Sequence, residues 1–173
     1  MKNYDQVLSA IRAMTDGNRF GLAPSRITLS TVGIIPKMLE LTRDIPSIQL
    51  ALSLHAPTQE LRQEIVPSAK SYPIEKLVEA MQYFIDRSKK RILVEYVLLD
   101  GVNASEKEAH QLGQLLKGMD VVSTQMKRLT RDSSDGAQCV TAFNHSNLCF
   151  CVAQFSLCLD DQFNSLQQYK CWC

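Results

Sequence analysis

The stretch that decides the fold is an apolar run with a polar end, Ile48-Gln49-Leu50-Ala51-Leu52-Ser53-Leu54, which leads into His55-Ala56-Pro57. A nearly continuous apolar run of this length is typical of a parallel β-strand that is covered on both faces. Proline has no backbone N–H to donate to a neighbouring strand, so Pro57 predicts that the strand has ended before it. We therefore expect a strand over residues 48–54 with polar groups at its carboxyl end.

Two further strands are expected, one on each side of this run in the sequence. Residues 26–32 are rich in β-branched side chains and are followed by Gly33, and residues 92–99 form a second apolar run. Apolar residues at spacings of three and four predict helices between and around the strands. These helices are expected over residues 4–14 and 37–42, as a short helix starting with residues 58–61, from residue 73 to the basic run at 89–91, and from residue 105 to about 117.

The ends of several helices carry recognisable signals. Asn3 is a candidate N-cap, and Ser105 with Glu108 three residues later forms a capping-box pattern. Gly17 is expected to end the first helix in a left-handed conformation. Pro36 stands where a helix tolerates proline best, in its first turn.

The order of helices and strands predicts an α/β fold. Strands separated by helical crossovers pair in parallel with right-handed connections. The chain begins with a helix that has no strand before it, and its roughly 120 patterned residues are about half of a complete barrel. Asp120-Val121-Val122 is interpreted as the start of a fourth strand that does not continue. We therefore expect a partial parallel βα barrel over residues 1–122, followed by an irregular, disordered tail over residues 123–173.

The cysteines separate these two parts of the chain. All six lie in the last 35 residues, at Cys139, Cys149, Cys151, Cys158, Cys171 and Cys173. The two C-x-C pairs lack the wider spacing and turn-forming residues of structural zinc sites. We therefore expect no metal site in the tail.

The composition excludes some classes of protein. The net charge is +1, so no overall basic field indicates nucleic acid or anionic lipid. No apolar run approaches the roughly 18 residues of a membrane-spanning helix, and the first residues lack the apolar core of a signal peptide. We expect no membrane partner.

Polar residues gather at the carboxyl ends of the three expected strands, where βα folds place their active sites. They are Ser30 and Thr31, then Ser53 and His55, then Asp100 and Asn103. Hydroxyl, imidazole and carboxamide groups suit a polar ligand such as a nucleoside or an amino acid. Nothing in their spacing predicts a hydrolytic triad. Each also has a purely structural interpretation, as a group that satisfies a strand end, a turn or a helix cap.

Two alternatives follow from the residues alone. A different βα-barrel enzyme would use the same edge for a phosphate or sugar, although the seven glycines form no phosphate-binding loop. Lys89-Lys90-Arg91 is interpreted as a solvated helix end and only secondarily as a phosphate contact. A non-catalytic or regulatory fragment is the other alternative, because an incomplete barrel leaves sheet edges unpaired.

Three segments carry a resemblance to a known family: residues 28–33, residues 50–57 and residues 94–103. Together they resemble the radical S-adenosylmethionine (SAM) methyltransferases that modify carbon 2 of an adenine in large-subunit ribosomal RNA, some of which also act on tRNA. The resemblance implies a partial (βα)₆ barrel, SAM and a [4Fe–4S] cluster as cofactors, and RNA as the partner. By motif match it assigns SAM contacts to Ser30 and to the segment Ser53, Leu54 and His55.

The chain also departs from the family pattern. The C-x₃-C-x₂-C motif that binds the cluster, the Gly-Glu-Pro strand and the methyl-carrying cysteine in its Ala-Cys-Gly-Gln setting do not occur in the sequence. None of the six tail cysteines is assigned that role, and no catalytic residue is assigned. We therefore expect a segment truncated at both ends and inactive by itself. Its location is expected to be the cytoplasm, or the chloroplast or mitochondrion in a plant.

Overall fold

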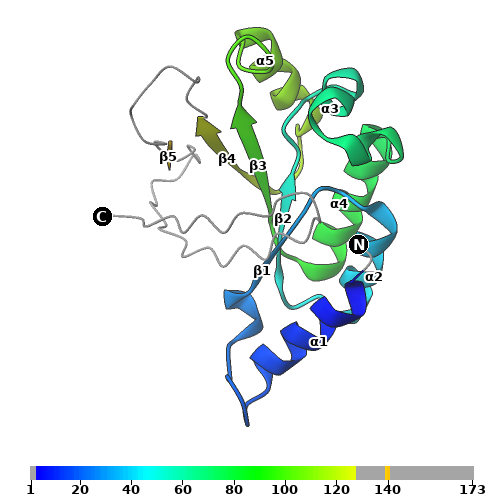
Figure 1. The fold of residues 1–173 in the computed structure, drawn as a ribbon, viewed down its shortest axis with the longest axis vertical. Coiled ribbons are helices and arrows are strands. Elements are labelled where there is room, and N and C mark those ends of the chain that lie inside the picture. The colour runs from blue at the N-terminus through cyan, green and yellow to red at the C-terminus, as the bar shows by residue number, and fades with distance from the viewer. Residues whose placement is uncertain (1–2, 128–138, 141–173) are drawn as a thin grey trace.

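A computed structural model describes residues 3–127 and 139–140. The elements follow one another in alternation along the described chain (Figure 1). They are α1 (Tyr4–Thr15), η1 (Pro24–Arg26), β1 (Thr28–Thr31), α2 (Ile35–Asp44), β2 (Gln49–Ser53), α3 (Gln59–Ile65), η2 (Pro67–Lys70), α4 (Ile74–Ser88), β3 (Ile92–Leu98), α5 (Glu106–Leu115), β4 (Val121–Lys127) and β5 (Cys139–Val140).

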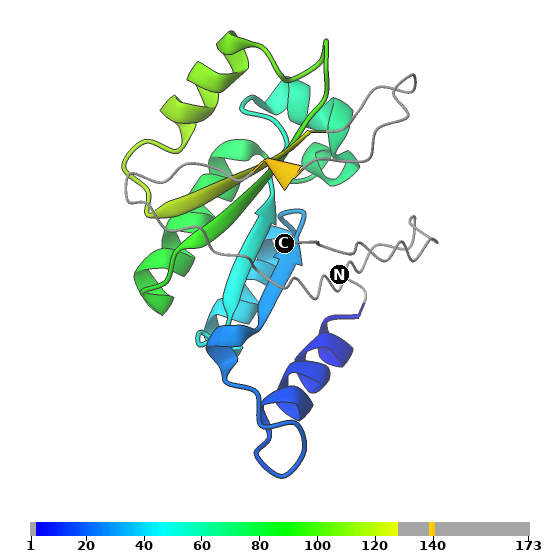
Figure 2. The ribbon, with the colours of Figure 1, turned by 90° about the vertical axis from the view of Figure 1, so that its left-hand side faces the viewer.

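The strands form one sheet in sequence order, β1-β2-β3-β4-β5. The first three pairs are parallel and the last is antiparallel. Helices α2, α4 and α5 lie on the same side of this sheet, behind the strands in Figure 2. The α/β fold and the parallel sheet are therefore confirmed, and the arrangement is that of a barrel segment rather than of a closed barrel.

The core lies between the sheet and these helices. Alternate residues of the strands point into it, among them Leu50, Leu52, Ile92 and Val94, and all four are fully buried. Burial of one such side chain contributes about 1.5–3 kcal/mol, so this layer holds the strands in register. The remaining alternate positions, which include Ser30, Ser53 and Glu95, share the opposite face of the sheet.

The fourth strand corrects the sequence analysis. It does not stop at Val122 but runs to Lys127, in register with β3 as far as Leu98. The exposed backbone groups of a long β3 bind a neighbouring strand whatever its side-chain pattern, which explains why an apolar pattern alone missed the continuation. The two residues of β5 pair with β4, so this piece of the expected tail is not irregular. The rest of the expected tail lies outside the described residues.

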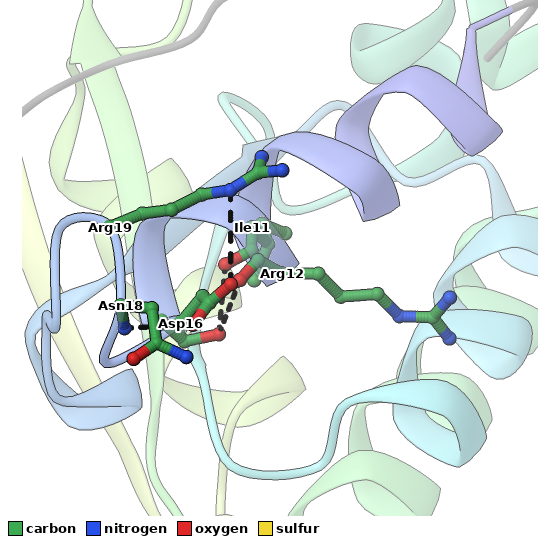
Figure 3. A network of polar contacts seen from close by, with 6 residues as sticks. Ile11, Arg12, Asp16, Asn18 and Arg19 are labelled. Carbon is green, nitrogen blue, oxygen red and sulfur yellow. Dashed lines mark hydrogen bonds and ion pairs between the residues drawn. The ribbon is translucent and has the colours of Figure 1, made fainter.

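The end of α1 differs from the expectation in its details. Gly17 does not adopt the left-handed conformation, which appears instead at Gly21, with a φ of 60°. The turn is held by local polar contacts, because Asp16 Oδ1 accepts from the Asn18 N–H at 2.9 Å and Asp16 also pairs with Arg19 (Figure 3). An aspartate side chain that accepts from the backbone two residues further on stabilises such a turn, and Gly21 supplies its left-handed residue.

Other predicted ends are confirmed. Ser105 and Glu108 form a complete capping box at α5, and Asn3 stands at the N-cap of α1 without a side-chain hydrogen bond. Within the residues that the structure describes, no helix is both long and apolar enough to cross a bilayer.

Candidate ligand site at the carboxyl edge of the sheet

The candidate site is built from residues at the carboxyl ends of β1 and β2 and from the middle of β3. The parallel register pairs Glu95 of β3 with Ser53, the last residue of β2, and β3 runs three residues further. Ser30 lies on the same face of the sheet, on the adjacent strand β1. The parallel register thus brings together side chains that are 42 and 65 residues apart in the sequence.

Glu95 joins the two serines. The hydroxyls of Ser30 and Ser53 both donate to Glu95 Oε2, each at 2.9 Å. Glu95 is 6% exposed, and hydrogen bonds to a carboxylate in such a setting are stronger than those between neutral groups. Since each hydroxyl uses its proton on Glu95, it turns only lone pairs toward any ligand. The serines therefore present hydrogen-bond acceptors.

Glu95 was missed by the sequence analysis. The available signal was a single acidic residue inside the apolar run of β3, where a charge is costly unless it is paired. Its partners come from two other strands, so only the register of the sheet reveals them.

His55 follows β2 and has a strained backbone with a φ of 59°. Its Nδ1 accepts from the Val97 N–H at 3.2 Å, and its own N–H points to the Glu95 carbonyl at 3.4 Å. Burial lowers the pKa of His55; the charge of Glu95 opposes this shift and the charge of Arg62 adds to it. The imidazole is therefore neutral at physiological pH.

Leu54 lies differently from its neighbours. Its side chain is fully buried in the core, its N–H donates to the Glu95 carbonyl, and its carbonyl accepts from Arg62 Nε at 3.2 Å. A ligand contact from Leu54 would therefore come from the main chain.

Asn103 belongs to the framework of the site. It is 1% exposed, and its amide nitrogen donates to the carbonyls of His55 at 2.7 Å and Val97 at 2.8 Å. Its amide oxygen accepts from the Leu99 N–H. Tyr96 donates to the Asn103 carbonyl, and burial raises the pKa of this phenol to about 12, so it stays protonated. Both ends of the Asn103 amide are engaged within the protein, which favours the structural interpretation over a ligand contact.

Two other predicted residues stand apart from the serines. Thr31 is buried and accepts from the Gly33 N–H, which satisfies the end of β1. Asp100 is exposed in the turn after β3. The basic run also has structural roles, since Lys89 caps α4 and Arg91 pairs with Asp120 at 2.7 Å, before the start of β3.

Arg62 of α3 ties the ends of β1 and β2 together. It is fully buried, and its guanidinium donates to the carbonyls of Val32 at 2.7 Å and Leu54 at 3.2 Å. Burial lowers its pKa. Gly33 makes room for it: a Cβ there would lie 3.2 Å from Arg62 Nη2 and 2.8 Å from a methyl carbon of Leu77.

Two further features of the described residues bear on where a metal ion or a ligand could bind. Among residues 3–127 and 139–140, no group of three His, Cys, Asp or Glu side chains is arranged to hold a metal ion. A hollow lies on the helix layer between α2 and α4, lined by residues such as Leu39, Arg43, Lys76 and Tyr83. None of the predicted site residues lines it.

Known proteins resemble this chain over part of their length. No family model matches the chain. It is 41% identical over 117 residues to the probable dual-specificity RNA methyltransferase RlmN of Thermoanaerobacter sp. (strain X514), an alignment that covers 68% of this chain and 34% of the relative. It is 42% identical over 122 residues to the dual-specificity RNA methyltransferase RlmN of Marinomonas sp. (strain MWYL1), covering 69% of this chain and 33% of the relative.

A solved structure gives the same result. The crystal structure of a radical SAM methyltransferase from Sphaerobacter thermophilus matches with a TM-score of 0.70 and 35% identity, covering 72% of this chain and 36% of that one. The chain spans about a third of the length of the relatives it matches. Over about two thirds of its length the chain is thus similar, in sequence and in fold, to part of the RlmN dual-specificity RNA methyltransferases and of a radical SAM methyltransferase.

Proposed function

We propose that residues 3–127 form part of the SAM site of an RNA methyltransferase, with Ser30, Ser53, Leu54 and His55 in contact with SAM. The observation that carries this proposal is the joint hydrogen bonding of Ser30 and Ser53 to one oxygen of Glu95 at the carboxyl edge of a parallel sheet. Ligands of open α/β sheets and βα barrels bind at this edge.

The residues at this edge suit an adenosyl ligand. Two serine oxygens with free lone pairs accept from hydroxyl, amino or ammonium groups, and a neutral imidazole N–H donates to an oxygen or a ring nitrogen. SAM carries all of these groups on its ribose, adenine and amino-acid parts. When bound, SAM supplies the methyl group and the adenosyl moiety on which radical chemistry depends.

The proposed reaction is methylation of carbon 2 of an adenine in large-subunit ribosomal RNA, and also in tRNA. Support comes from relatives whose names state dual specificity toward RNA. The net charge of +1 gives no broad basic surface, so RNA would be bound by a local patch or by other parts of the full protein.

The [4Fe–4S] cluster does not fit the residues at hand. The described residues hold no three-ligand group, and the 173-residue sequence contains no C-x₃-C-x₂-C motif. We therefore propose that this chain by itself does not methylate RNA.

Calorimetry with SAM and the purified full chain tests the binding proposal. We expect saturable binding that weakens at least tenfold in the Ser30→Ala/Ser53→Ala double variant. Ser71→Ala, which changes an exposed serine of the same kind, is the matched control and should bind like the parent. Absence of SAM binding to the parent chain, or equal binding to the double variant, would refute the assignment.

Anaerobic reconstitution with iron and sulfide tests the second part. We expect neither a stable cluster absorbance nor reductive cleavage of SAM by the 173-residue chain. Appearance of both would overturn the proposed inactivity while leaving the SAM assignment intact.

A further inference from the structure

The imidazole of His55 is held in one chemical form by a main-chain donor. The Val97 N–H donates to His55 Nδ1 at 3.2 Å. A peptide N–H keeps its proton, so Nδ1 must carry a lone pair. In a neutral imidazole with a lone pair on Nδ1, the proton is on Nε2.

The groups around the ring favour this neutral form. Burial disfavours a charged imidazolium, and Arg62 on α3 adds a nearby positive charge. Glu95 on β3 acts in the opposite direction. If Nδ1 were protonated, its N–H would face the N–H of Val97, and the existing hydrogen bond would be lost.

Asn103 holds both sides of this hydrogen bond. Its Nδ2 donates to the carbonyl of His55, whose left-handed backbone aims the ring, and to the carbonyl of Val97, whose N–H meets the ring. Its Oδ1 accepts from the Leu99 N–H and completes the attachment to the end of β3. The Asn103 side chain thus holds the acceptor, Nδ1 of His55, in place relative to the donor, the N–H of Val97.

We propose that Asn103 is a positioning residue that locks His55 as a neutral imidazole with its proton on Nε2, so that the site offers the ligand a fixed hydrogen-bond donor. His55 then recognises an acceptor atom, such as a carboxylate, ribose or ring-nitrogen atom, and does not act as a general base. The proposed SAM site identifies the ligand; the locked tautomer follows from the contacts of the protein alone.

Nitrogen-15 NMR of the imidazole rings in the labelled full chain at pH 7 tests the tautomer. Three histidines occur, and His55→Gln identifies the signals of interest. We expect Nδ1 of His55 in the unprotonated class and Nε2 in the protonated class, without added ligand. Protonated Nδ1, a charged ring or an averaged pair of signals in the parent would overturn the proposal.

Substitution of Asn103 tests its role. Asn103→Asp keeps the acceptor for Leu99 and removes both donated hydrogen bonds, whereas Asn103→Leu removes all three. In each folded variant we expect the Nδ1 and Nε2 signals of His55 to move toward each other, because the ring then exchanges between its two neutral tautomers. Asn18→Asp, at an exposed asparagine, should leave them unchanged.

The outcomes separate positioning from simple structural support. A folded Asn103→Asp chain that keeps the parent ring signals would refute the positioning role. If both variants unfold, the nitrogen–nitrogen scalar coupling across the Val97 N–H···Nδ1 hydrogen bond is measured in the parent chain, and its absence counts against the lock. A locked tautomer in a chain that fails to bind SAM would refute the proposed ligand and not the lock.

Discussion

Two polar networks in this protein have opposite characters. At the end of α1, Asp16 interacts with Asn18 and Arg19, two and three residues further on; Asn18 and Arg19 are exposed and Asp16 is half-buried (Figure 3). At the carboxyl edge of the sheet, Glu95 binds serines 42 and 65 residues away, and the fully buried Arg62 binds the carbonyls of Val32 and Leu54. The first network forms a turn, whereas the second joins the ends of β1 and β2 to the middle of β3. Buried polar networks between distant residues make a structure more rigid than exposed local ones do.

Arg62 gives the largest expected effect. Arg62→Met leaves the carbonyls of Val32 and Leu54 without their buried donors. We expect a loss of about 3 kcal/mol in the free energy of unfolding, measured by urea denaturation of the full chain. Arg19→Met, at the exposed arginine of the α1 network, is the control and should cost under ~0.5 kcal/mol. Equal effects of the two variants would remove the contrast between the networks.

Gly33 is the next test, because the packing of Arg62 depends on it. Gly33 has a φ of 88°, and an added Cβ would press on Leu77 and Arg62. Gly33→Ala should destabilise the chain by about 2 kcal/mol by the same measurement. Gly101→Ala also has a positive φ, at 70°, but meets no atom within 4 Å, so it should cost only the backbone strain of about 1 kcal/mol. A Gly33→Ala variant no less stable than Gly101→Ala would contradict the packing described here.

The pH dependence of the free energy of unfolding tests whether the ring of His55 is buried and neutral in the folded protein. Its pKa is lowered in the folded protein, so the unfolded chain binds a proton first as the pH falls. The contribution of His55 to stability is complete above its ordinary value of 6.5 and is lost as the pH falls from there to the folded pKa. Urea midpoints at pH 7.5 and pH 5.5 should therefore differ more in the parent than in His55→Gln. An identical difference in both chains would contradict the buried, neutral state of this ring.

The smallest effect is expected in the α1 network itself. Asp16→Ala removes one hydrogen bond to the Asn18 N–H and one exposed ion pair of 3.8 Å. We expect a change of no more than ~0.5 kcal/mol, which 0.5 M salt reduces further. A loss comparable to that of Arg62→Met would show that local contacts matter as much as the buried network.

The sequence predicted what depends on local pattern. The strands around Ser30, Ser53 and residues 92–98 and the capping box at Ser105 are local features, and all are present. Glu95 and Arg62 were not predicted as parts of the site, because their partners are set by sheet register and by the packing of α3. The strand ending at Lys127 was missed for a similar reason, since its pairing partner rather than its own side chains stabilises it. The assignment of SAM to the site came from the family resemblance rather than from pattern.

Amide chemical-shift mapping of the full chain with added SAM tests the central claim most directly. We predict that the signals of Ser30, Ser53 and His55 move in a saturable way, while those of Leu39 and Tyr83 beside the hollow between α2 and α4 stay in place. Movement confined to that hollow, or no movement at the carboxyl edge of the sheet at saturating SAM, would contradict the account.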